Sequence, residues 1–318
     1  MSFSNAPDDA LLGRVAGALA VDEAFVEKDW FVVQAIERLS GLATENFTPV
    51  FSGGTSLLKA YGLISRFSED IDFKLLLSDG FMARSRNQRR QVLKAFRDAI
   101  VDTWTELGFN VTSCISRDEH RFIELEMTYP TVMQPHSSLR PHILAQVSAK
   151  SPRLAVQHKA ITSLAGQYAR SAPEVPDIAC IDPVETAADK LSAFSWRMLL
   201  RDRAHEDDDP TIVRHLHDLA ALEPLAMEHP EFPTLLKTIL AEDSHRGGGG
   251  VANMAPRDRL AAMREKLATD PEYTREYERF VRGMAFAGDA DVPEFGAAVA
   301  AVARLCNLVP VRMASAGP

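Results

Sequence analysis

The sequence has few cysteines and no long hydrophobic run, and each shortage removes a class of protein. Cys114, Cys180 and Cys306 lie far apart along the 318 residues, which fits neither a disulfide framework nor a CxxC metal site. No apolar run reaches the roughly 20 residues that span a bilayer, since Arg304 interrupts the Ala-rich stretch 297–308. The first ten residues are polar and acidic, so we expect no signal peptide, no membrane contact and a cytoplasmic protein.

The composition is that of a folded protein, with 46% hydrophobic and 25% charged residues. The chain length predicts about two domains. A net charge of −9 argues against general coating of nucleic acid but allows a local basic patch. Such a patch occurs once, without an intervening acid: Arg84, Arg86, Arg89, Arg90, Lys94 and Arg97. On a helix, several of these side chains would share a face that could contact phosphates, although basic runs are usually solvated helix surfaces.

The spacing of hydrophobic residues predicts a mixed sheet region followed by an almost wholly helical region. Helices are expected at 8–19, 26–42, 55–61, 84–107, 182–203, 211–222, 256–269, 272–283 and 293–308. Strands are expected at 47–52, 70–76, 110–116, 122–129 and 143–147, and the four glycines at 247–250 predict a flexible loop. We therefore expect an α+β fold, with a sheet domain over 1–165 and a helical domain over 166–318.

Two glycines stand between a predicted strand and a predicted helix, in the segment FSGGTSLLK at 51–59. Gly53 and Gly54 let the backbone turn tightly and approach a ligand closely. The following helix would present free N–H groups and the positive end of its dipole to an anion. Nearby hydroxyls and a charge come from Ser52, Thr55, Ser56 and Lys59. The pattern is typical of a phosphate site, but alone it is weak because many strand-to-helix turns contain glycine.

Asp70 and Asp72 follow at a spacing that places both carboxylates on one face of a strand, roughly 6.6 Å apart along the chain. Two such carboxylates repel unless a cation bridges them. Beside a phosphate site they suit Mg²⁺, which prefers oxygen ligands and retains waters and triphosphate oxygens. The metal would activate an attacking hydroxyl and stabilise the departing pyrophosphate. The alternative is an acidic, solvated edge strand, which the neighbouring GGTS segment, Arg66 and Ser68 make less favourable.

The helical region contributes a lysine and an aspartate. Lys190 borders an apolar stripe and has no acid at helical spacing for an ordinary surface pair. Asp218 has Arg214 one turn away, so a local ion pair is an alternative to a functional role. His215 and His217 point apart on a helix, which favours incidental histidines over a zinc cluster.

Four motifs, in order, resemble the AbiEii/AbiGii (MenT-like) nucleotidyltransferase toxins of the polymerase-beta-like superfamily. They are GGTSLLK at 53–59, RFSEDID at 66–72, ETAADKLSAF at 185–194 and RHLHDL at 214–219. Together they span residues 51–219, about half the chain. The resemblance implies a nucleotidyltransferase-like mixed sheet with flanking helices, followed by a mainly helical domain that contributes Lys190 and Asp218 to the cleft.

The resemblance also implies roles for individual residues. Gly53, Gly54, Thr55, Ser56 and Lys59 would hold the nucleotide, and Arg66 and Ser68 would shape the start of the second strand. Asp70 and Asp72 would hold Mg²⁺, Lys190 would contact the triphosphate, and Asp218 would orient Lys190 or the substrate. One departure concerns Gln146, where relatives are expected to carry an acid on the later strand. A third metal carboxylate is then missing, or comes from Glu124 or Glu126.

The implied activity is Mg²⁺-dependent transfer of NMP from an NTP to a hydroxyl, as the toxin of a type IV-like toxin–antitoxin system. The resemblance implies the tRNA 3′ end as acceptor, a block of translation and growth, and a cognate antitoxin. We expect the phosphates of the acceptor to dock on the basic run 84–97. A monomer is the default expectation. Two alternatives stay open: an NTP- or GTP-binding module without transfer, which Gln146 favours, and transfer onto a protein or a small molecule.

Overall fold

The structure is a computed structural model that describes residues 3–206, 208–244, 248–284 and 292–309. It divides into two compact units. The sheet unit comprises the chain up to Gly62 together with Arg66–Asp182, and the helical unit comprises Leu63–Ser65 and the chain from Pro183 onward. The main border between the two units lies at 182/183, and the domain border expected from the sequence, at 165/166, lies within the sheet unit.

The sheet unit contains a seven-stranded mixed sheet in the order β3-β4-β5-β2-β1-β7-β6, counted over the described residues. Its strands are β1 (Phe47–Ser52), β2 (Ile71–Leu77), β3 (Asn110–Arg117), β4 (Phe122–Thr128), β5 (Ile143–Ser148), β6 (Gln157–Ile161) and β7 (Val175–Cys180). Its helices are α1 (Asp9–Leu19), α2 (Glu23–Ser40), α3 (Gly53–Lys59), α4 (Asp79–Met82), α5 (Arg86–Leu107) and α6 (Leu164–Ala169).

The chain order of the strands explains where the sheet unit ends. β2 pairs antiparallel with β1 and parallel with β5, whereas β7 runs parallel to β1 and antiparallel to β6. Sequence reasoning missed β6, α6 and β7, and the two strands extend the same sheet on the side of β1 away from β2. Because β7 hydrogen-bonds directly to β1, the segment up to Asp182 belongs to the sheet unit.

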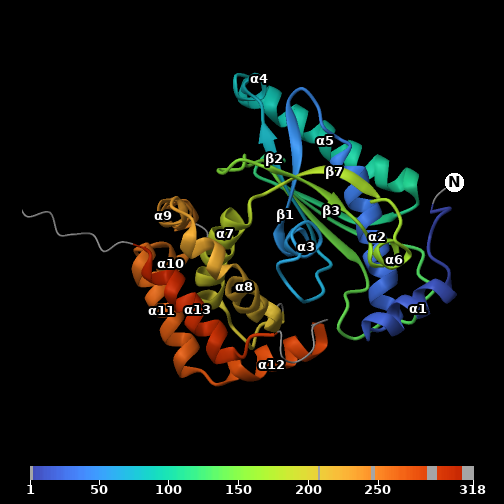
Figure 1. Cartoon of the computed structure of the whole chain (residues 1–318). Coiled ribbons are helices and arrows are strands. Elements are labelled where there is room, and N and C mark those ends of the chain that lie inside the picture. The colour runs from blue at the N-terminus through green and yellow to red at the C-terminus, as the bar shows by residue number, and fades with distance from the viewer. Residues whose placement is uncertain (1–2, 207, 245–247, 285–291, 310–318) are drawn as a thin grey trace, which may run out of the picture. The chain divides into compact units, whose positions relative to one another are not determined.

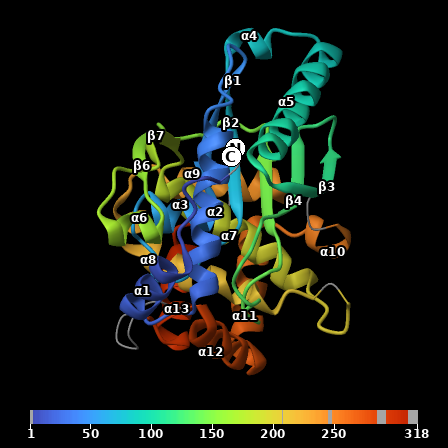
Figure 2. The ribbon, with the colours of Figure 1, turned by 90° about the vertical axis from the view of Figure 1, so that its right-hand side faces the viewer.

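One face of the sheet is apolar and is covered by α2 and α5 (Figures 1 and 2). Phe51 and Phe73 lie opposite each other on β1 and β2 and are buried on this face, as the period-2 alternation of a strand requires. Phe96 of α5 packs edge-on against Phe47, with ring centroids 4.7 Å apart. The opposite face of β2, β5 and β4 carries Asp72 and other polar residues, because these alternate with the buried ones.

The helical unit consists of α7–α13 and a short 3-10 helix in the described residues. The elements are α7 (Pro183–Leu200), η1 (Pro210–Val213), α8 (Arg214–Glu228), α9 (Phe232–Glu242), α10 (Gly249–Ala252), α11 (Pro256–Thr269), α12 (Glu272–Met284) and α13 (Phe295–Asn307). α7 packs against α8, α9 and α11, and α13 packs against α8. The expected α+β fold with a helical C-terminal region is confirmed.

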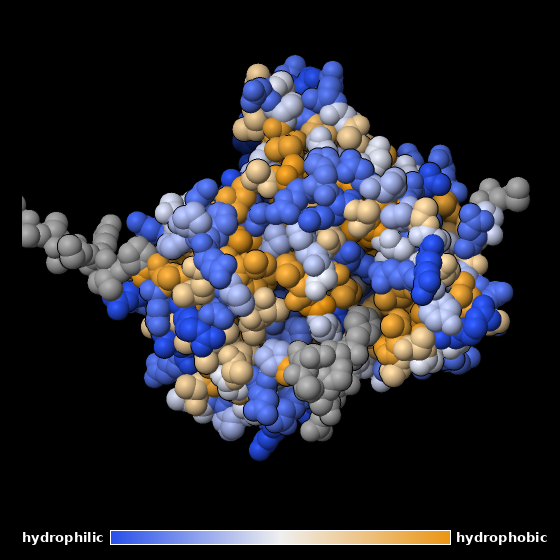
Figure 3. All heavy atoms as spheres, viewed as in Figure 1, coloured by the Kyte–Doolittle hydropathy of each residue, from blue (hydrophilic) through white to orange (hydrophobic). Residues whose placement is uncertain are grey.

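The glycine run 247–250 is corrected in part by the structure. Gly249 and Gly250 begin α10 instead of lying in a loop, while position 247 lies outside the described residues. None of the helices in the described ranges is both long and apolar enough to cross a membrane. Hydrophilic and hydrophobic residues are intermingled over the face shown in Figure 3.

Candidate functional site

β1 passes into α3 without an intervening loop, and glycine is required at the junction. Gly53 has a φ of +77°, a left-handed conformation that L side chains rarely adopt. A Cβ at this position would lie 2.0 Å from Oδ2 of Asp72. The carboxylate of Asp72 therefore lies directly against the backbone of the glycine turn. The structure places the two sequence motifs, 53–59 and 66–72, at one point of the sheet unit.

Gly54 brings the remaining residues of the second motif to the same turn. A Cβ on Gly54 would lie 2.8 Å from Oγ of Ser68 and 2.9 Å from Nη2 of Arg66. The hydroxyl of Thr55 donates to the carbonyl oxygen of Asp70 and lies 3.0 Å from Oγ of Ser68. The side chains of Thr55, Ser68 and Arg66 are all buried. Backbone, hydroxyl and guanidinium groups thus converge around a short strand-to-helix turn.

The polar face of the sheet continues from Asp72 to two further strands. Asp72 is in register with Gln146 of β5, which is in register with Glu124 of β4. Nε2 of Gln146 donates a hydrogen bond of 2.7 Å to Oε2 of Glu124. Glu126 lies two residues further along, 4.0 Å from Nε2 of His142. Gln146 therefore occupies the position beside Asp72. The carboxylate that contacts Gln146 is that of Glu124.

Asp70 lies immediately before β2, and its carboxylate contacts an arginine that the sequence analysis missed. Nη1 of Arg140 is 2.6 Å from Oδ1 of Asp70. Arg140 belongs to the loop between β4 and β5, and its contact spans 70 residues along the chain. No local sequence signal marks this pair, because only the pairing of β2 with β5 brings the loop to Asp70.

Helix α2 carries three buried charges that the sequence pattern did not predict. Glu27, Lys28 and Asp29 are all buried, although helix surfaces usually expose such residues. Asp29 forms an ion pair with Lys59, and both side chains are 1% exposed. Burial raises the pKa of Asp29, and Lys59 opposes that shift. Lys59, expected at the nucleotide, thus has a structural partner within the sheet unit, and its nucleotide contact remains a prediction.

The residues around the turn fit a divalent cation of the Mg²⁺ type. Asp70 and Asp72 offer carboxylate oxygens, the ligands that Mg²⁺ prefers. Because Gly53 has no side chain, the Asp72 carboxylate lies directly against the turn, and Asp70 already accepts a positive charge from the guanidinium of Arg140. Among the described residues, no cluster of three or more His, Cys, Asp or Glu side chains is close enough to hold a metal. The candidate site therefore rests on two carboxylates.

Lys190 and Asp218 meet within the helical unit. Nζ of Lys190, on α7, lies 2.8 Å from Oδ2 of Asp218, on α8. The side chain of Asp218 is completely buried, and that of Lys190 is 11% exposed. Nη1 of Arg214, the alternative partner considered for Asp218, lies 3.6 Å from Oδ2 of Asp209. The lysine and aspartate of the third and fourth motifs therefore form a buried ion pair.

The neighbouring histidines are part of the packing of α8. His215 is buried, with its ring centroid 5.7 Å from that of Phe194. Burial lowers its pKa well below the ordinary value, and Lys190 adds to the shift. His215 is therefore neutral at physiological pH. His217 is also buried, with Nδ1 3.5 Å from Oδ1 of Asp218.

The basic run forms the N-terminal half of α5, which starts from a capping box at Ser85 and Gln88. Tertiary contacts supply acids that the local sequence lacks, since Nε of Arg86 lies 2.8 Å from Oε1 of Glu119. Arg84 precedes the helix and contacts Asn46, and Arg97 pairs with its neighbour Asp98. Arg90 and Lys94 are exposed, whereas Arg89 is half-buried. Three of the six basic residues are half-buried and Arg86 is paired with Glu119, so the basic surface open to solvent comprises fewer residues than the run.

Comparisons with known proteins identify the family and the fold of the chain. Residues 38–301 match the family described as nucleotidyl transferase AbiEii toxin, type IV TA system. No curated protein sequence matches the chain. Among solved structures, MenT4, a nucleotidyltransferase toxin from Mycobacterium tuberculosis H37Rv, is similar with a TM-score of 0.51 and 18% identity, covering 94% of this chain and 99% of that one. That likeness shows a shared fold. Because the family match covers most of this chain, the chain belongs to the AbiEii nucleotidyltransferase toxins of type IV toxin–antitoxin systems.

Proposed function

We propose that this toxin transfers NMP from an NTP to an acceptor hydroxyl at the glycine turn of the sheet unit, with Mg²⁺ held by Asp70 and Asp72. The observation that carries the proposal is the contact between the Asp72 carboxylate and the backbone of Gly53. A carboxylate against a turn of this kind places a cation ligand where the turn can approach a phosphate. The family implies an NTP substrate and a cognate antitoxin.

In the proposed reaction, the acceptor hydroxyl oxygen bonds to the α-phosphorus of the NTP. The bond between that phosphorus and the β-phosphate oxygen breaks, pyrophosphate leaves, and the hydroxyl proton passes to a carboxylate or to water. Mg²⁺ would neutralise the charge on the phosphates. Thr55, Ser56, Arg66 and Ser68 would fix the nucleotide beside Asp72.

Lys190 would contribute its positive charge to the triphosphate, and Asp218 would orient Lys190. The buried 2.8 Å ion pair supports the second of these roles, because it restrains the ammonium group to one position.

We propose the tRNA 3′ end as the acceptor, with Arg89, Arg90 and Lys94 binding its phosphates. The exposure of Arg90 and Lys94 on α5 supports this surface. A local basic surface on an otherwise acidic chain concentrates phosphate binding in one place.

The test is incubation of the toxin with each labelled NTP, Mg²⁺ and total tRNA. We expect label in the tRNA with the wild-type protein and none with Asp72→Asn or Lys190→Ala, each variant still unfolding in one cooperative thermal transition, at a lower temperature for Lys190→Ala because it leaves Asp218 without its ammonium partner. Label transfer by a folded Asp72→Asn variant would contradict the proposed site.

A nucleotide-binding module without transfer is the second candidate, and the amide of Gln146 beside Asp72 favours it. The same assay separates the two, since retention of nucleotide without labelled product would indicate binding alone. Label in protein or in a small molecule, with none in tRNA, would instead reassign the acceptor.

A further inference from the structure

Arg140 is held in place through its backbone by a buried ion pair. Lys28 and Glu69 form this pair, with the Lys28 side chain completely buried. Nζ of Lys28 donates to the carbonyl oxygens of Arg140, at 2.6 Å, and of His142, at 3.0 Å. The backbone N–H of Arg140 donates to the Glu69 carboxylate at 3.3 Å. Both backbone polar groups of Arg140 are thus fixed by one lysine–glutamate pair.

The start of the same loop is fixed by the preceding residue of α2. The carboxylate of Glu27 accepts hydrogen bonds from the hydroxyl of Thr131 and, at 2.7 Å, from the backbone N–H of Val132. Burying consecutive charges on a helix is costly unless each is paired and hydrogen-bonded. Glu27 and Lys28 therefore stabilise one particular conformation of the loop between β4 and β5.

The side chain of Arg140 extends from this fixed backbone to Asp70. Nη1 lies 2.6 Å from Oδ1 of Asp70, and the two side chains are 36% and 28% exposed. An incidental surface pair joins two mobile side chains and contributes little. Here one partner has an anchored backbone, and the other carries a carboxylate proposed as a cation ligand.

We propose that Arg140 is a positioning residue that pairs with the Asp70 carboxylate when no divalent cation is bound and yields that carboxylate when the cation arrives. This inference rests on the proposed function, which assigns Asp70 as a cation ligand. Asp70 and Asp72 are carboxylates separated by one residue, so a positive charge close to either of them reduces their mutual repulsion. The guanidinium of Arg140 supplies such a charge at Asp70, and a divalent cation that binds Asp70 must compete with it.

Competition between Arg140 and the cation predicts in which direction the affinity for divalent cations changes when Arg140 is replaced. A purely structural role of Arg140 predicts a different result. Removing the guanidinium while keeping the backbone anchor should strengthen divalent-cation binding, because the competing charge is gone. If Arg140 served only to hold the loop or to shape Asp70, its removal would weaken cation binding or leave it unchanged. The contacts of Lys28 and Glu69 are to the Arg140 backbone, so Arg140→Met leaves them intact.

The experiment titrates the full chain with Mn²⁺ as the probe, followed by the electron paramagnetic resonance of free Mn²⁺, with and without a non-hydrolysable ATP analogue. Arg140→Met should bind Mn²⁺ about three- to tenfold more tightly than wild type, and Arg140→Lys should stay close to wild type. Arg121→Met removes the same charge from an exposed turn of the sheet unit and should leave the affinity unchanged.

Equal or weaker Mn²⁺ binding by a folded Arg140→Met variant would overturn the inference while leaving the proposed function intact. A matching gain in Arg121→Met would overturn it too, because the effect would then be one of net charge. If neither wild type nor Arg140→Met bound Mn²⁺, even with the nucleotide analogue, both the inference and the metal role of Asp70 would fail.

Discussion

The carboxylate of Asp72 occupies the space that a side chain at Gly53 would need, with Oδ2 2.0 Å from the position of a Cβ. The contact joins the segments 53–59 and 66–72. Each segment can be recognised in the sequence as a motif, but the sequence does not show that the two motifs touch.

Replacing Gly53 by Ala should therefore displace Asp72. Gly62→Ala is a matched control, because Gly62 also has a positive φ of +61° but has no neighbour within 4 Å of its Cβ. Both variants carry a backbone strain of about 1–2 kcal/mol. Only Gly53→Ala should lose label transfer, by about a hundredfold, because a misplacement near 1 Å at the reacting centre has that effect. Similar losses in both variants would show that strain, and not displacement of Asp72, is responsible.

The buried pair of Lys190 and Asp218 allows the effect on stability to be separated from the effect on activity. Lys190→Met leaves the Asp218 carboxylate buried without its ammonium partner, which costs about 3–5 kcal/mol in the free energy of unfolding. Combining it with Asp218→Leu should recover much of that stability, as denaturant titration would show, without recovering label transfer. Glu223→Gln, which removes an ion pair with the exposed Arg304, should change neither quantity. Recovery of transfer in the double variant would remove Lys190 from the site.

The pair of Lys59 and Asp29 allows the nucleotide role of Lys59 to be separated from its structural role. Lys59→Met alone should destabilise the sheet unit by about 3–5 kcal/mol, because it leaves Asp29 buried beside no cation. The double variant Asp29→Asn with Lys59→Met should regain stability. Titration of a non-hydrolysable ATP analogue should then show weaker binding than wild type if Lys59 contacts phosphate. Unchanged affinity in the folded double variant would contradict that contact.

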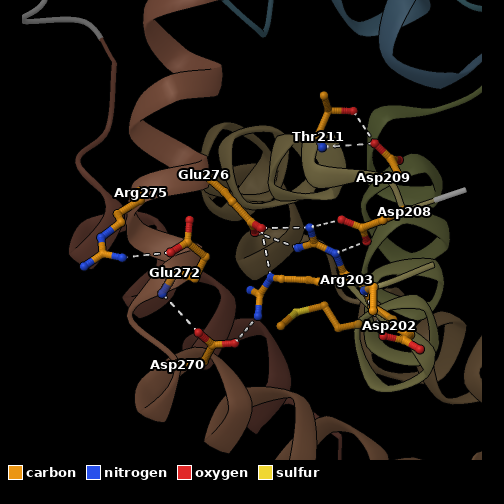
Figure 4. A network of polar contacts seen from close by, with 12 residues as sticks. Asp202, Arg203, Asp208, Asp209, Thr211, Asp270, Glu272, Arg275 and Glu276 are labelled. Carbon is orange, nitrogen blue, oxygen red and sulfur yellow. Dashed lines mark hydrogen bonds and ion pairs between the residues drawn. The ribbon is translucent and has the colours of Figure 1, made fainter. Parts of the chain in front are cut away.

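A charged cluster should make the helical unit sensitive to acid (Figure 4). Arg201 forms ion pairs with Asp208 and Glu276, both at 2.6 Å, and Arg203 forms one with Asp270, also at 2.6 Å. Hydrogen bonds from Arg201 and Arg203 hold the pKa values of Asp208 and Asp270 below their ordinary value of 3.8.

Carboxylates with lowered pKa values stabilise the fold above the pKa of the unfolded chain, and the effect is lost as pH falls through the folded-state values. The melting temperature should therefore fall steeply as pH drops below about 4. Asp208→Asn should lower the melting temperature at pH 7 and reduce its acid dependence. If the melting temperatures of wild type and Asp208→Asn changed by the same amount with pH between pH 2 and 7, this explanation would be contradicted.

The basic surface of α5 should control acceptor binding. Arg90→Glu with Lys94→Glu should weaken tRNA binding and reduce the salt dependence of the dissociation constant, because fewer counterions are released. Arg14→Glu with Arg38→Glu makes the same charge change at exposed positions on α1 and α2 and serves as control. Equal losses in both double variants would assign the effect to net charge. Filter binding of tRNA at several salt concentrations measures both quantities.

The spacing of apolar residues along the sequence predicted several helices and strands close to their observed bounds. β1 and α11 have the predicted bounds, and α7 begins at Pro183, one residue after the predicted start of that helix at 182. β6 and β7 were missed because QHKAI and VPDIAC are short and lack a clear alternation of apolar and polar residues. β7 is placed by its pairing with β1, and β6 is placed by its pairing with β7, and both pairings join segments that are distant along the chain.

The sequence by itself determined the family, and it marked the glycine turn, the two aspartates, and the lysine and aspartate of the helical unit as candidates for the site, because these lie in short motifs with fixed spacing. Tertiary structure alone decided that Asp72 touches Gly53, that Arg140 pairs with Asp70 and that Asp29 neutralises Lys59. Those contacts join residues far apart in the chain, and their geometry depends on strand order and on burial, which spacing along a sequence does not encode.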